Sequence, residues 1–226
     1  MQADVWQKYE VLFWVLTGIF VYLLILTIIY LVLKTAFHKK LGGIGLYLSY
    51  FFMFPLLLLG EITAYPRRRK MWLIRSGLKE GHSYLEEGIG LGTSPILASR
   101  IVGAKGRIYA LDNHPLQIIL LSLRSKIRRI KNIKLILSDA SKTYLEDNSI
   151  DTIFICDAFH EFPDKRNTVM ELYRVLKPEG SLTILEETVR NTNNTQKIIE
   201  YTKLFKLIER DKKFIRFKKN KFQNKE

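Results

Sequence analysis

The chain has 226 residues, and its 36 lysine and arginine residues outnumber its 22 acidic residues, so its formal net charge at pH 7 is +14. This charge favours an anionic partner, either a membrane that contains anionic lipids or a nucleic acid. A single cysteine excludes a disulfide framework, and the four histidines lack zinc-ligand spacing, so no metal site is expected.

The first predicted element is an apolar helix over residues 11–33. These 23 residues carry no charge, and a helix of that length crosses a hydrocarbon core of roughly 30 Å with some tilt. Tryptophan and tyrosine residues near its ends suit the membrane interface, and the preceding residues are not the basic leader of a signal peptide. We therefore expect a membrane-spanning helix here.

A second apolar segment covers residues 42–62, and Pro55 within it is tolerated in a membrane helix. The loop before it carries three lysines, whereas the other side, up to Arg75, carries six lysine or arginine residues. This bias favours a multi-pass membrane protein with both termini in the cytoplasm. A segment that only dips into the bilayer is the alternative. The predicted division is a membrane anchor over residues 1–66 and a cytoplasmic domain over residues 67–226, with the basic residues 67–70 near anionic headgroups.

The next stretch reads as strand, glycine turn, helix and strand. Leu85 ends the first strand, and glycines follow at positions 88, 90 and 92, where a missing Cβ permits a sharp turn and the close approach of a ligand. Ser94 is the expected N-cap of the helix, with Pro95 at its first position. The second strand ends in Asp112, where an α/β nucleotide fold places a carboxylate for ribose hydroxyls. The pattern predicts a nucleotide-type ligand.

From residue 70 onward helices and strands alternate, which indicates a parallel sheet with helices on both faces. The expected helices cover residues 70–78, 115–130, 164–176 and 195–204, and the expected strands cover residues 133–137, 150–156 and 181–186. Residues 177–180 read as a tight turn, and residues 205–209 and 214–217 as a closing hairpin. The helix over 115–130 is amphipathic. Its apolar residues at helical spacing are Leu116, Ile119, Leu120, Leu123, Ile127 and Ile130, and its basic face is expected to be solvated, with a lipid or RNA contact as the alternative.

Four motifs together resemble those of class I S-adenosylmethionine (SAM)-dependent methyltransferases. They are the glycine turn at 86–92, Asp112, Ser138-Asp139-Ala140, and the sequence LYRVLKPEG at 172–180. The spacing G-x-G-x-G differs from the G-x-G-x-x-G/A of dinucleotide-binding domains. The resemblance covers roughly residues 67–217 and is strongest to the ubiquinone/menaquinone-biosynthesis C-methyltransferases, although Glu86 stands where that family usually has aspartate. It implies an α/β, Rossmann-like methyltransferase sheet, mostly parallel, with an antiparallel edge hairpin.

The resemblance also implies S-adenosyl-L-methionine as the cofactor and assigns residues to its parts. Glu86, Gly88, Gly90 and Gly92 would lie at the methionine and ribose, and Asp112, with its neighbour Asn113, at the ribose hydroxyls. Asp139 and Ala140 would contact the adenine, and Asp157 would line the face where the methyl group is transferred.

An in-line methyl transfer needs an aligned nucleophile, and a base helps when that nucleophile must lose a proton. His160 and Glu161 are the candidate bases, with a pocket wall and a loop residue as their structural alternatives. Cys156 is interpreted as a buried strand residue rather than a nucleophile.

The sequence therefore predicts a membrane-anchored methyltransferase that acts on a lipid-soluble acceptor. The anchor carries this prediction, because a soluble acceptor would not require it. Prenylated quinones or phenols, other isoprenoid lipids and phospholipid amines are the candidate acceptors. The alternatives are methylation of a membrane protein or of a soluble small molecule, and a non-catalytic membrane scaffold. The motifs of nucleic-acid methyltransferases are absent, so the expected partners are the bilayer and a lipid, not a nucleic acid. The sequence does not give the oligomeric state.

Overall fold

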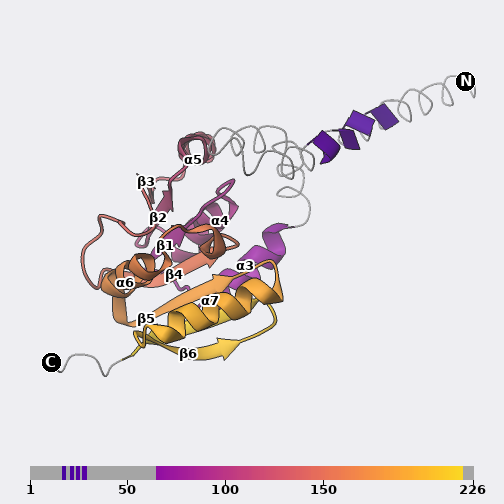
Figure 1. Ribbon diagram of the computed structural model, residues 1–226. Helices are drawn as coiled ribbons and strands as arrows, with labels where there is room; N and C mark the ends of the chain where they lie inside the picture. Colours follow the sequence, from indigo (N-terminus) through magenta and orange to yellow (C-terminus); the bar gives the residue numbers. More distant parts are fainter. Residues whose placement is uncertain (1–16, 19–20, 23, 26, 30–64, 221–226) are drawn as a thin grey trace, which may run out of the picture. The chain divides into compact units, whose positions relative to one another are not determined.

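The computed structural model describes residues 17–18, 21–22, 24–25, 27–29 and 65–220 (Figure 1). The chain divides into two units, Met1–Ala64 and Tyr65–Glu226. The described residues of the first unit are helical. Within the described part of the chain, no helix has the length and apolar character needed to cross a membrane. The predicted helix over 42–62 lies outside the described residues, as does most of the one over 11–33.

The second unit is built on a seven-stranded sheet with the strand order β3-β2-β1-β4-β5-β7-β6. The strands from β3 to β5 pair in parallel, and β7 pairs antiparallel with both β5 and β6. This arrangement confirms the predicted Rossmann-like sheet with an antiparallel edge hairpin. In chain order the elements are α3 (Tyr65–Arg75), β1 (Ser83–Glu87), α4 (Thr93–Val102), β2 (Arg107–Asp112), α5 (Pro115–Ile127), β3 (Ile133–Leu137), β4 (Ile150–Cys156), the 3-10 helix η1 (Phe159–Glu161), α6 (Lys165–Val175), β5 (Leu176–Leu185), α7 (Val189–Tyr201), β6 (Phe205–Arg210) and β7 (Phe214–Lys219).

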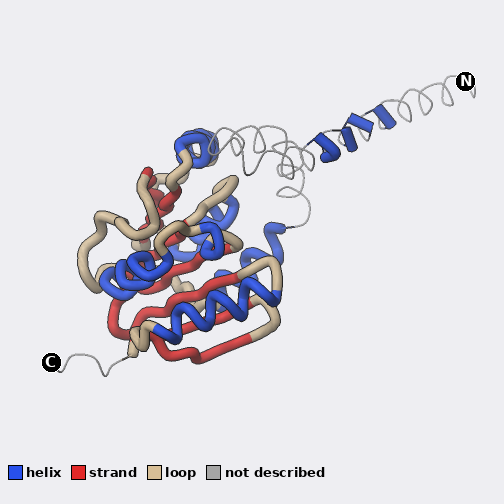
Figure 2. Tube along the Cα trace, viewed as in Figure 1, coloured by secondary structure: helices blue, strands red, loops and turns tan. Residues whose placement is uncertain are grey.

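Apolar side chains cover both faces of the sheet, because successive residues of a strand point to opposite sides. On one face Tyr84 and Phe154 pack with Leu73 of α3 and Ala98 of α4. On the other face a larger core joins Leu85 and Ile153 to apolar residues of α6 and α7. Figures 1 and 2 show the helices on both sides of the central strands. Burial on both faces explains why β4 reads as a nearly continuous apolar run.

The chain leaves β1 for β2 on one side and later returns to place β4 on the other side of β1. The carboxyl ends of β1 and β4 therefore flank a topological switch point, which is where open α/β sheets bind their ligands. The residues that follow β1, β2, β4 and β5 share this edge of the sheet.

Several predicted boundaries were wrong. The helix expected over 70–78 is α3, which begins at Tyr65, and the helix expected over 195–204 is α7, which begins at Val189. Gly92, not Ser94, is the N-cap of α4, and Pro95 is its third residue. The tight turn expected at 177–180 is the first half of β5, because Leu176 already pairs with Ile150 and a bulge then resets the register.

The amphipathic pattern of α5 also indicated the wrong buried face. The buried residues of α5 are Gln117, Leu121 and Ser125, which lie four residues apart. The residues Leu116, Ile119, Leu123 and Ile127 of the predicted apolar face are exposed instead. Almost every residue from Leu116 to Leu123 is apolar, so the spacing of apolar residues does not fix how the helix is rotated.

Candidate active site

The three glycines after β1 have similar backbone angles but different surroundings. Their φ angles are +73° at Gly88, +51° at Gly90 and +77° at Gly92, a region that favours glycine. A Cβ on Gly88 would come within 2.4 Å of the Ala158 side chain, and a Cβ on Gly92 within 2.7 Å of Leu121. A Cβ on Gly90 would meet nothing within 4 Å. Gly90 is therefore the glycine at which the backbone is open to a ligand, whereas the other two are required by packing.

Asp112 at the end of β2 holds this turn in place. One carboxylate oxygen accepts a hydrogen bond from the Ile89 amide at 3.0 Å, and the other accepts one from the His114 amide at 2.9 Å. Burial raises the pKa of Asp112, and the backbone donors at His114 and Ile89 oppose that rise. Each oxygen of a carboxylate can accept more than one hydrogen bond, so both remain able to accept from a pair of vicinal hydroxyls. The neighbouring Asn113 is exposed.

Arg124 of α5 supports the same turn. Its guanidinium donates to the Leu91 carbonyl and, at 3.2 Å, to the Thr93 hydroxyl. Arg124 belongs to the basic face of α5, which was expected to be solvated, and no sequence pattern indicates its contact, because that contact depends on the rotation of α5. The turn is thus held from β2 by Asp112 and from α5 by Arg124.

The two glutamates before the turn point to opposite faces of the sheet. Glu86 is buried and accepts a hydrogen bond from the Tyr84 hydroxyl at 2.7 Å. Burial, followed by the charge and hydrogen bond of Glu86, raises the pKa of Tyr84 well above its ordinary value. Both carboxylate oxygens of Glu87 are buried without a hydrogen-bond partner. Burial, followed by the charges of Glu171 and Asp139, raises the pKa of Glu87 well above its ordinary value, which favours the neutral carboxyl.

The loop after β3 brings the predicted adenine contacts next to Asp112. The Ser138 amide donates to the Asp112 carbonyl at 3.1 Å, which joins this loop to the end of β2. One oxygen of Asp139 accepts from the amide and the hydroxyl of Ser141 at 2.8 and 2.6 Å. Ala140 is buried. The structure therefore gathers Gly90, Asp112 and Asp139 at one edge of the sheet.

Beyond β4 and β5 lies a hydrogen-bonded histidine and glutamate pair. His160 Nδ1 lies 2.8 Å from Glu186 Oε2, and Glu186 Oε1 accepts from the Thr195 hydroxyl at 2.8 Å. The Glu186 side chain is fully buried, whereas that of His160 is 34% exposed. A carboxylate only accepts, so in a neutral imidazole this contact places the proton on Nδ1 and leaves Nε2 as an acceptor. Sequence reasoning missed Glu186, since nothing in the sequence shows that it lies beside His160.

The other two predicted residues of this region lie beside the pair. Asp157 adopts a φ of +53° and accepts from the Glu187 amide at 2.9 Å. The Glu161 carboxylate is 65% exposed and lies 3.8 Å from His160 Nε2. Burial raises the pKa of the Cys156 thiol to about 12, which disfavours the thiolate that a nucleophile requires.

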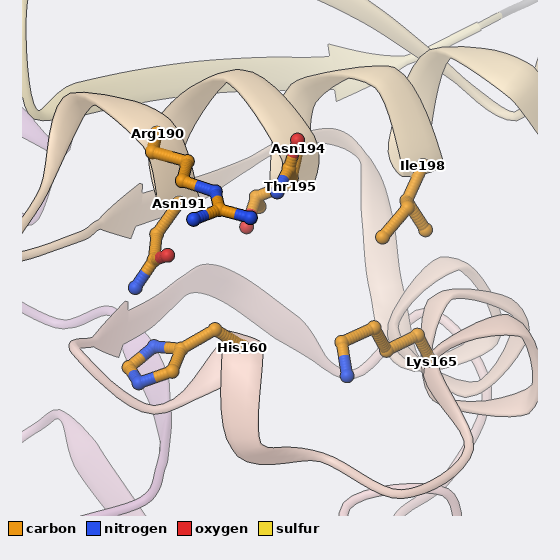
Figure 3. Close-up of a pocket in the computed structure, with 7 residues that line it drawn as sticks. All are labelled: His160, Lys165, Arg190, Asn191, Asn194, Thr195 and Ile198. Atoms are coloured by element: carbon orange, nitrogen blue, oxygen red, sulfur yellow. The ribbon is translucent and has the colours of Figure 1, made fainter.

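His160 also lines a pocket of about 320 Å³ between η1 and α7. Figure 3 shows the residues of α7 facing His160 and Lys165 across this pocket. The full lining is His160, Lys165, Arg190, Asn191, Asn194, Thr195 and Ile198. The pocket combines a histidine, two cationic side chains and several amide or hydroxyl groups, so it suits a polar or anionic group. Glu161 is not among the lining residues.

Among the described residues, one group of side chains could act as metal ligands. The possible ligand atoms of Asp157, His160 and Glu186 lie within 4.8 Å of one another. A divalent ion could use these atoms, but His160 Nδ1 and Glu186 Oε2 already form a hydrogen bond with each other. A metal would have to replace that bond and its proton. The arrangement fits an oriented histidine better than a metal centre.

The comparisons with known proteins agree with this geometry. Residues 85–184 match the family model described as a methyltransferase domain. The demethylmenaquinone methyltransferase of Geobacillus sp. (strain WCH70) is 29% identical over 124 residues, 53% of this chain and 53% of that protein. The ubiquinone/menaquinone biosynthesis C-methyltransferase UbiE of Klebsiella pneumoniae is 32% identical over 114 residues, 49% of this chain and 45% of that protein. The chain thus spans about half the length of the curated relatives it matches.

Solved structures give the same result for the fold. A SAM-dependent methyltransferase from Aquifex aeolicus superposes with a TM-score of 0.59 at 26% identity, covering 66% of this chain and 87% of that chain. A SAM-dependent O-methyltransferase from Thermotoga maritima also has a TM-score of 0.59, at 17% identity, and covers 72% of this chain and 68% of that chain. The second likeness shows the fold alone.

Proposed function

We propose that the class I SAM-dependent methyltransferase domain of this chain transfers a methyl group to a lipid-soluble acceptor at the membrane. A prenylated quinone or phenol is the leading acceptor, ahead of other isoprenoid lipids and phospholipid amines. The observation that carries the proposal is the oriented His160–Glu186 pair, whose histidine lines a pocket between η1 and α7. The similarity to quinone C-methyltransferases supports the same class of acceptor.

The residues around the glycine turn fit the cofactor. The open backbone at Gly90 leaves room for it, and the buried Asp112 carboxylate, held beside that turn, can accept from two ribose hydroxyls. Asp139 and Ala140 lie next to Asp112 and can contact the adenine. When bound, SAM supplies a methyl group already activated by its sulfonium. The protein then has to align the acceptor, exclude water and remove any proton that the acceptor loses.

His160 is the group that would take this proton. Glu186 fixes the Nδ1 proton, so Nε2 is the acceptor for a phenolic or ring proton of the substrate. Lys165 and Arg190 line the same pocket, where their positive charges would favour an acceptor oxygen that becomes anionic. Lys165 is positioned by its ammonium group, which donates to the Phe162 carbonyl at 2.7 Å. Glu161 remains a second candidate for proton transfer, from the solvent side.

Two features support the membrane part of the proposal. The segments over 11–33 and 42–62 have the composition of membrane helices, and the net charge of +14 favours an anionic surface. The described residues of the first segment are helical, and Val21, Tyr22, Leu24, Ile25 and Ile28 expose large apolar side chains. Such side chains suit a lipid environment.

The test is incubation of the full chain with methyl-labelled SAM and a total lipid extract, followed by chromatography of the lipid and aqueous fractions. We expect the label in a lipid of the prenylated quinone or phenol class. His160→Gln should lower turnover about a hundredfold or more, and Glu186→Gln should lower it about tenfold. Both variants should retain their affinity for SAM. Label found only in protein or in the aqueous fraction would replace the lipid acceptor with a protein or a soluble molecule.

A further inference from the structure

The exposed stripe of α5 is an apolar surface on the described part of the domain that the proposed function does not use. Its side chains are 52% exposed at Leu116, 53% at Ile119, 53% at Leu123 and 78% at Ile127. Spacings of three and four residues place them on one side of the helix. We call these four residues the α5 stripe. The helix packs on β3, the edge strand of the sheet, so the stripe lies at the periphery of the domain (Figure 1).

Basic residues without acidic neighbours in the sequence accompany the stripe. No acidic residue occurs between Asp112 and Asp139. Lys126 in the last turn, and Arg128, Arg129 and Lys131 just beyond it, are all exposed. Arg124 is the exception, because it is directed to the glycine turn. An apolar stripe joined to a cluster of exposed cations is the pattern of a helix that lies in the plane of a membrane interface.

We propose that the α5 stripe and its adjoining basic cluster bind the surface of a membrane that contains anionic lipids. The aliphatic side chains would enter the boundary between headgroups and acyl chains, while Lys126, Arg128 and Arg129 contact phosphate groups. A nucleic acid fits less well, because the stripe offers no aromatic side chain on which a base could stack. This surface belongs to the domain itself, so the inference does not rest on the apolar segments before residue 65.

The inference is tested by measuring the depth of a fluorescent label in the full chain. Leu123→Cys is labelled with bimane, and the protein is reconstituted in vesicles of phosphatidylcholine with about one third phosphatidylglycerol, doped with a nitroxide on the acyl chain. The matched control is Met170→Cys on α6, because Met170 has the same 53% exposure as Leu123. Both variants also carry Cys156→Ala, which removes the native thiol.

We expect the nitroxide to quench the label at position 123 at least about threefold more than the label at position 170. Replacing Lys126, Arg128 and Arg129 together with glutamine should reduce this difference to the value found in pure phosphatidylcholine. Equal, weak lipid quenching at both positions, with position 123 open to aqueous iodide, would show a solvated face and overturn the inference. Weak quenching by both reagents at position 123 would also overturn it, since another part of the chain or a second copy would then cover the stripe. Methylation of a lipid acceptor is assayed separately, so the two proposals can fail independently.

Discussion

The glycine turn shows that residues of one type serve different purposes. Gly90 has open space at its Cα, whereas Gly92 packs against Leu121. We predict that Gly90→Ala lowers SAM affinity at least about tenfold with a stability loss of about 1 kcal/mol, because the added methyl group occupies ligand space and strains a positive φ. Gly92→Ala should destabilise the fold more than Gly90→Ala. Calorimetry with SAM and thermal unfolding of both variants check this. A Gly90→Ala protein that binds SAM normally would contradict it.

Asp112 contributes to the cofactor site and also to the geometry of the turn. Asp112→Ala removes the acceptor for the Ile89 amide as well as those for the ribose hydroxyls. We expect a loss of about 1.5–3 kcal/mol in SAM binding, measured by calorimetry. Asp112→Asn keeps one acceptor oxygen and should lose less. If both variants bind SAM as the natural protein does, the ribose is held elsewhere.

Glu87 gives the domain a pH-dependent stability. Its pKa is raised in the folded state, so its contribution is fully present below the ordinary carboxyl value of 4.5 and is lost as pH rises through the folded pKa. Glu87→Gln cannot ionise. The unfolding free energy of this variant minus that of the natural protein should therefore increase as pH rises above 4.5, by up to about 1.4 kcal/mol per pH unit. Urea unfolding of both proteins at several pH values tests this, and a difference independent of pH would contradict it.

At the scale of elements, a buried hydrogen bond joins the end of α3 to β5. The Ser181 hydroxyl donates to the Ser76 carbonyl at 2.6 Å, and both residues are buried. Ser181→Ala leaves that carbonyl without its donor, so we predict a loss of about 1–3 kcal/mol in unfolding free energy. Ser149→Ala is the matched control, because the Ser149 hydroxyl donates to a carbonyl in an exposed position. Equal urea midpoints for the two variants would show that α3 is held without this bond.

The sequence was most informative where burial leaves a continuous pattern. The run Ile150–Cys156 predicted a strand because both of its faces are covered, and the glycine turn and Asp112 do lie together, joined by the hydrogen bond from the Ile89 amide. The rotation of α5 was not predictable from apolar spacing, because it is set by the contact of Leu121 with Gly92 and by Arg124. Glu186 was missed for a related reason. Its role exists only because the sheet places the ends of β4 and β5 side by side.

At the scale of the whole molecule, the apolar N-terminal segments and the domain should separate in function. Because α3 begins at Tyr65, a chain shortened to residues 65–226 contains every helix and strand described for the second unit. We predict that it binds SAM with unchanged affinity, loses most activity on an acceptor in vesicles, and recovers part of it on a water-soluble analogue. Its residual vesicle activity should fall with salt, because its basic surface is then the main attachment. Equal vesicle activity of the short and full chains would show that the N-terminal segments do not provide access to the acceptor.

The contact between Gly88 and Ala158 restricts how this site can evolve. A Cβ at position 88 would overlap the Ala158 methyl group, so alanine at position 88 requires glycine at position 158. Alanine at position 88 while Ala158 is present is therefore unfavourable, whether or not a cofactor binds. A descendant that lost the cofactor would retain Gly88 and Gly92 for packing, while at position 90 only the positive φ would still favour glycine. Among distant relatives, Gly90 is thus the glycine whose retention reports a functioning cofactor site.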